Sequence, residues 1–190
     1  MLLRRGLTLE YLTLGWNVIG CVVLLAAAVS VRSVALAGFG VDSVIEIVAS
    51  LVVVWQLRGS TNANRQRTAL RVIAIAFGAL ALYLGVQVAA SLARGSHAGH
   101  STAGIVWLAL TVCAMLALAA AKRDTGRRLA NPVLATEAHV TLIDAAVAAA
   151  VLTGVALNAV AGWWWADPAS ATFIFLYAAR EARHAWQESG

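Results

Sequence analysis

Residues 33–57, SVALAGFGVDSVIEIVASLVVVWQL, form a long apolar run whose only charged members are Asp42 and Glu46. A helix needs about 20 predominantly apolar residues to cross the hydrocarbon layer of a bilayer, and this run is long enough to do so. A charged side chain inside such a helix is rare and is usually functional. The run therefore predicts a transmembrane helix that carries two acidic groups at membrane depth.

Five further hydrophobic segments have a similar length, near residues 11–31, 69–93, 103–121, 135–159 and 166–182. The 190-residue chain is 61% hydrophobic and 12% charged, with a mean hydropathy of +0.80. Soluble globular proteins carry about 25% charged residues, so the chain lies far outside that class. We therefore predict an all-α integral membrane protein, a six-transmembrane-helix bundle in a single domain that covers residues 1–190.

The basic residues are distributed asymmetrically along the chain. If the six helices alternate in direction, only Arg32 and Arg94 of the 14 Lys and Arg residues lie on one side of the membrane. The positive-inside rule then places both termini in the cytoplasm, as in a multi-pass protein of a bacterial inner membrane. The same bias explains the net charge of +5 and the pI near 10.0 without a nucleic-acid partner.

Three of the nine acidic residues, Asp42, Glu46 and Asp144, lie deep inside the predicted spans. Within the spans, Arg71 and Arg180 each lie two residues from an end, so no Lys or Arg is expected at the depth of these acids to balance them. One charge at the bilayer centre costs about 2.5 to 3.5 kcal/mol on insertion scales, so the carboxylates must be neutralised. Either protons or a bound cation can do this.

The three acids are expected at nearly the same depth in the membrane. From the rise of an α-helix, Asp42 lies roughly 14 Å, Glu46 roughly 20 Å and Asp144 roughly 16 Å below the outer surface. Residues four apart share a helix face, so Asp42 and Glu46 can both point at Asp144. We predict a cation or proton site here. In the alternative, the acids stay protonated and bind polar neighbours such as Ser43, Ser50, Asn17 or Gln87.

Two segments, DSVIE at 42–46 and TEAHVTLIDAAVAAAVLTG at 136–154 followed by GWWWADP at 162–168, resemble the cation diffusion facilitator family. Members of that family are six-span exporters of zinc and related divalent metals that exchange the metal for protons. The resemblance implies metal binding by Asp42, Glu46 and Asp144. It covers most of the chain, but only the second and fifth spans carry specific motifs.

The sequence departs from the family pattern in two ways. The usual motif His-x-x-x-Asp would place a His four residues before Asp144, where this chain has Val140. His139 is one residue early and, at about 100° per residue, is expected to face away, whereas Glu137 shares the face of Asp144 and can act as a ligand at the cytoplasmic mouth. The chain also stops soon after the sixth span, where typical members continue into a cytoplasmic metal-sensing and dimerising domain.

A site built from carboxylates offers oxygen ligands alone. Zinc commonly takes His or Cys, so manganese or ferrous iron remains possible, although zinc is the first choice because of the resemblance. We therefore predict divalent-cation efflux by proton antiport, with the metal and protons as substrates and no permanently bound cofactor. A homodimer is the assembly that we consider. The alternative is a non-transporting membrane adaptor or accessory subunit with a degenerate metal site. No G-x-S-x-G or HExxH motif indicates an enzyme.

Outside the spans, Asp167 stands before Pro168 at the start of the sixth segment. This pair is typical of a helix start, with the acid as the cap and proline in the first turn. We therefore predict a capping role for Asp167 rather than metal binding.

Overall fold

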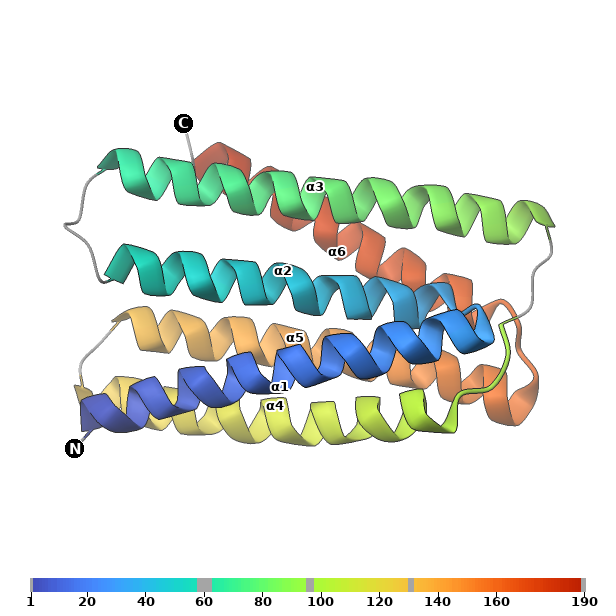
Figure 1. Ribbon diagram of the computed structural model, residues 1–190, viewed down its shortest axis with the longest axis horizontal. Coiled ribbons are helices and arrows are strands. Elements are labelled where there is room, and N and C mark those ends of the chain that lie inside the picture. The colour runs from blue at the N-terminus through green and yellow to red at the C-terminus, as the bar shows by residue number, and fades with distance from the viewer. Residues whose placement is uncertain (1, 58–62, 95–97, 130–131, 189–190) are drawn as a thin grey trace.

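The computed structural model describes residues 2–57, 63–94, 98–129 and 132–188, and within these ranges the chain is built from six α-helices (Figure 1). They are α1 (Leu2–Val31), α2 (Val34–Leu57), α3 (Ala63–Arg94), α4 (Thr102–Leu129), α5 (Pro132–Ala161) and α6 (Ala166–Glu188). The predicted all-α, six-helix architecture is confirmed.

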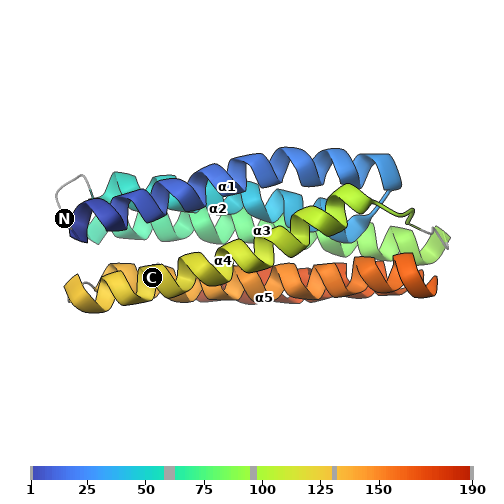
Figure 2. The same cartoon turned by 90° about the horizontal axis from the view of Figure 1, so that it is seen from below.

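The helices run lengthwise and alternate in direction, so both chain termini lie toward one end of the bundle (Figure 1). We call this the terminal end. Helix α4 packs mainly on α5, α3 packs mainly on α6, and α1 contacts both α2 and α4 (Figures 1 and 2). Helix α2 also touches α3, α5 and α6, which makes it the central element of the bundle.

Among the described residues, four stretches are long and apolar enough to cross a membrane: Arg4–Val31, Arg71–Arg94, Thr102–Arg128 and Val140–Ala161. They belong to α1, α3, α4 and α5. The predicted spans in α2 and α6 are helical, but crossing by these two helices remains a prediction. Several helices extend beyond the apolar segments, and α4 continues to Leu129.

Asp167 ties the start of α6 to the start of α2 at the end of the bundle opposite the termini. Its carboxylate accepts a hydrogen bond from the Ser33 hydroxyl and others from the backbone N–H groups of Val34, at 3.0 Å, and Ala35, at 3.4 Å. The predicted capping role is correct, but the helix that Asp167 caps is α2 rather than its own. In the same turn, Arg32 adopts a left-handed φ of 55° to reverse the chain.

Helices α5 and α6 approach each other closely at Gly154. A Cβ atom at this position would lie 2.7 Å from the carbonyl oxygen of Ala166. Small residues permit such close helix contacts in membranes, where no hydrophobic force draws helices together. Helix α5 lies in the bundle interior at this contact. Val147 and Val151, which follow Asp144 on α5, are fully buried there.

Candidate metal centre

The carboxylates of Asp42 and Glu46 on α2 meet that of Asp144 on α5. One oxygen from each of the three groups lies within 4.8 Å of the other two. Asp42 is 2% exposed and Asp144 is 5% exposed, while Glu46 is partly buried. The spacing of four residues places Asp42 and Glu46 on one face of α2, and this face meets α5. The arrangement offers a cation three carboxylate ligands from two helices.

Two oxygens of this carboxylate cluster are poorly satisfied by the protein. Asp42 Oδ1 and Asp144 Oδ2 are buried without a hydrogen-bond partner among the described residues. Buried polar atoms are nearly always hydrogen-bonded, because an unpaired one loses its hydration without compensation. The donor set therefore suits a divalent cation, which would be coordinated by several such oxygens at once.

Asn17 of α1 supports the cluster from the side. Its Nδ2 donates a hydrogen bond of 2.9 Å to Glu46 Oε2. Asn17 is itself buried, so the amide is held in place and fixes the orientation of the Glu46 carboxylate. Of the polar neighbours that the sequence suggested, Ser43 instead donates to the Phe39 carbonyl and Gln87 is exposed. The side chain of Ser50 lies outside the described part of the structure.

The remaining candidate ligands are on the first half of α5. The side chains of Glu137 and His139 lie outside the described part of the structure, so their role stays a prediction. Val140 stands where the family motif has His, is 42% exposed, and has no ligand atom. Among the described side chains, the candidate centre consists of oxygen ligands.

The expectation that no basic residue inside the bundle balances the three acids is wrong. Lys122 of α4 is completely buried, and its Nζ donates hydrogen bonds of 3.1 Å to Glu10 Oε2 on α1 and 3.2 Å to Thr141 Oγ1 on α5. The predicted fourth span ends at residue 121, so Lys122 was expected just outside it. In the structure α4 continues, and successive residues differ by about 100°, so Lys122 faces inward while Arg123 is exposed.

One signal in the sequence could have revealed this contact. Glu10 and Lys122 lie at corresponding ends of the first and fourth predicted spans, and an acid and a base at equal depth are candidates for pairing. Tyr177 of α6 is a further group that the sequence did not suggest. It lies within electrostatic range of all three cluster carboxylates and packs edge-on against Phe77, with ring centroids 5.9 Å apart.

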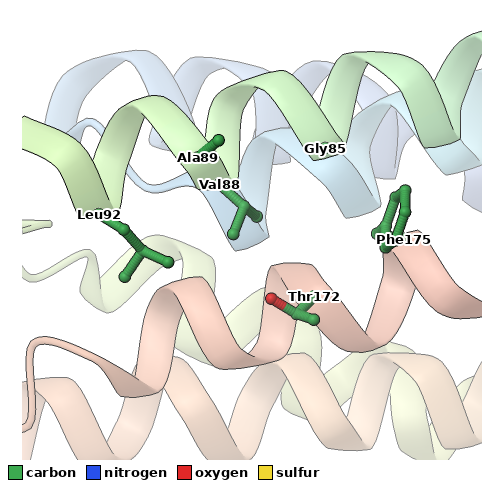
Figure 3. A pocket seen from close by; sticks show the side chains of 6 residues that line it. All are labelled: Gly85, Val88, Ala89, Leu92, Thr172 and Phe175. Atoms are coloured by element: carbon green, nitrogen blue, oxygen red, sulfur yellow. The ribbon is translucent and has the colours of Figure 1, made fainter.

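A cavity of about 320 Å³ lies between α3 and α6 and is separate from the carboxylate cluster (Figure 3). It is lined by Gly85, Val88, Ala89, Leu92, Thr172 and Phe175. None of these six residues carries a carboxylate, imidazole or thiol, so they offer none of the side-chain ligands that a metal commonly takes.

A bundle of long apolar helices that encloses an acidic cluster is typical of a multi-pass membrane protein. The chain belongs to the cation efflux family, since residues 11–190 match the family's transmembrane domain. Members of this family are divalent-cation transporters rather than enzymes. The match confirms the resemblance drawn from the sequence. No protein of curated function matches the chain.

Proposed function

We propose that this protein exports a divalent cation, with zinc as the first choice, through the carboxylate cluster of Asp42, Glu46 and Asp144. The observation that carries the proposal is the convergence of three acidic side chains, two of them fully enclosed, from helices α2 and α5. Membership of the cation efflux family supports a divalent cation as the substrate of this cluster.

The choice of metal follows from the ligand chemistry. Three carboxylates can hold zinc at about 2.0 to 2.2 Å and leave a position for water, but they also suit manganese and ferrous iron. Asn17 restrains Glu46, as hydrogen-bond partners of metal ligands commonly do. We expect zinc to be transported with weaker discrimination against manganese than a site containing His would give.

Protons are the proposed exchange substrate. Carboxylates must be deprotonated to bind a metal, so protons and metal compete for the same oxygens. Because the three groups lie within 4.8 Å of one another, they titrate as a coupled unit rather than separately. Metal entering past Glu137 from the cytoplasm would displace protons, and protons arriving from the outer side would release the metal.

Transport into proteoliposomes that contain a metal-sensitive dye tests this function. Under an imposed pH gradient, the wild type should move zinc, with manganese, iron, cobalt and cadmium compared in parallel. Asp144→Asn should abolish the flux because it removes one charged ligand while preserving the shape of the side chain. Asp124→Asn is the matched control, since Asp124 is a partly exposed acid on α4 that pairs with Arg128.

Equal fluxes for the wild type and Asp144→Asn would contradict the assigned site. Zinc binding by the wild type without any flux, under every pH gradient, would instead favour the adaptor function. A flux that does not respond to the pH gradient would refute proton exchange and leave metal transport intact.

A further inference from the structure

Lys122 places a positive charge inside the bundle, and binding of a cation by the carboxylate cluster does not explain this charge. Its side chain has no exposed surface, although a buried ammonium group loses all of its hydration. Its partner Glu10 uses one oxygen for the contact, while the other, Oε1, is buried without a hydrogen-bond partner. The acid thus contributes one oxygen to this contact rather than the two of a bidentate ion pair.

The position of Lys122 relative to the metal centre is set by Thr141. Thr141 and Asp144 are three residues apart on α5, so they share a face and differ by about 4.5 Å along the helix axis. Thr141 precedes Asp144 on a helix that starts at the terminal end. The ammonium group of Lys122 therefore lies one helical turn from the cluster on its terminal side, and its charge reaches the Asp144 carboxylate.

A lysine side chain is able to use this proximity. Its ammonium group is a compact charge on a flexible four-carbon stem, so small rotations about that stem move the charge by several ångströms. In an interior with little water, such a charge interacts strongly with carboxylates and is only weakly screened by salt. Lys122 and a divalent cation are therefore competitors for the negative charge of the cluster.

We propose that Lys122 is the internal counter-ion of the carboxylate cluster: its ammonium group rests on Glu10 and Thr141 while the metal is bound, and turns toward Asp144 when the metal leaves. The inference rests on the proposed function of the cluster. It makes Lys122 a positioning residue that keeps metal affinity low enough for release and blocks return of the metal toward the terminal end.

The test compares zinc affinity and transport rate in variants that change this charge. Glu10→Gln/Lys122→Met removes both charges of this ion pair. We expect the double variant to bind zinc at least about tenfold more tightly, because a neighbouring positive charge is gone. In proteoliposomes its KM for zinc and its maximal rate should both fall, since release becomes slow.

Two further variants separate this role from a structural one. Lys122→Arg retains the charge and should return zinc affinity to within about threefold of the wild type. Arg123→Met removes a neighbouring basic residue that is exposed, so it should leave affinity and rate unchanged. Zinc affinity is measured in detergent by competition with a metal-sensitive dye.

Thr141→Val provides a test that does not depend on the folding of the double variant. It preserves the shape and both charges but removes the hydroxyl on which the ammonium group rests. The ammonium group should then compete more effectively for Asp144, so zinc affinity should fall, opposite to its change in the double variant. Unchanged affinity in Thr141→Val, or unchanged affinity and rate in a folded double variant, overturns the inference.

The proposed function fails in a different way. If the wild type neither binds nor transports zinc or the other tested divalent metals, the site assignment and the role of Lys122 both fall. If the wild type binds and transports metal but the variants of Lys122 and Thr141 behave like it, only the counter-ion role is refuted.

Discussion

Asp144→Asn is expected to stabilise the metal-free protein while it removes metal binding. In the wild type, three carboxylates are held within 4.8 Å of one another by the packing of α2 on α5. Like charges at this distance repel, and folding forces them together. Asparagine keeps the shape of the side chain, removes one charge, and brings an amide that can donate to the unpaired Asp42 Oδ1.

The size of this effect follows from the distance between the carboxylates. Two unit charges 4.8 Å apart repel by about 3.5 kcal/mol at an effective dielectric constant of 20. Protons shared within the cluster relieve part of that repulsion, and the variant also loses attraction to Lys122. We therefore expect a gain of about 1 to 3 kcal/mol at pH 8, or roughly 2 to 4 °C in Tm for each kcal/mol. At pH 5 the gain in unfolding free energy should be smaller, because protonation of the carboxylates already lowers their repulsion in the wild type.

Thermal unfolding in detergent, with and without zinc, measures both parts of the prediction. Zinc at 100 times its Kd should stabilise the wild type by about 2.7 kcal/mol and should stabilise the variant much less. Asp124→Asn is the control, because its ion pair with Arg128 is largely exposed and contributes less than about 1 kcal/mol. A metal-free Asp144→Asn protein that is less stable than the wild type at pH 8 would refute the reasoning.

Three other substitutions test the supports of the site. Asn17→Ala should weaken zinc binding by about 10- to 100-fold, because Glu46 loses the hydrogen bond that orients it. Dye competition measures the Kd, and an unchanged Kd would show that Asn17 does not position the ligand. Asp167→Ala should lower the free energy of unfolding by about 1 to 3 kcal/mol, because α2 loses its cap, and should leave zinc affinity unaltered. A loss of zinc-binding free energy larger than the loss of unfolding free energy would contradict this. Gly154→Ala should lower Tm, because the new Cβ would clash with the backbone oxygen of Ala166. Gly78→Ala should leave Tm unchanged, because no atom lies near its Cβ position. Equal Tm values for the two variants would argue against the close contact.

Most of the fold could be predicted from the sequence because hydrophobic length is a strong signal in membrane proteins. The six apolar segments correspond to the six helices. The ends of the helices were less predictable, since hydropathy marks where a segment stops being apolar and not where it stops being helical. Thus α1 begins at Leu2 rather than near residue 11, and α4 runs to Leu129 rather than to residue 121.

The carboxylate cluster could be predicted because helix geometry fixes both depth and facing from residue numbers alone. Asp42, Glu46 and Asp144 meet as their spacing suggested. The environment of the cluster depends on helix rotation and on which helices are neighbours, and neither follows from hydropathy. For this reason neither the burial of Lys122 inside the bundle nor the helix that Asp167 caps could be predicted.

Metal stoichiometry tests the central claim most directly. Equilibrium dialysis of the purified protein against zinc should show one tightly bound ion per chain for the wild type. Asp42→Asn/Glu46→Gln/Asp144→Asn should bind none with comparable affinity while keeping its helical circular dichroism. Equal zinc binding by this triple variant and the wild type would contradict the claim that these three carboxylates hold the transported ion.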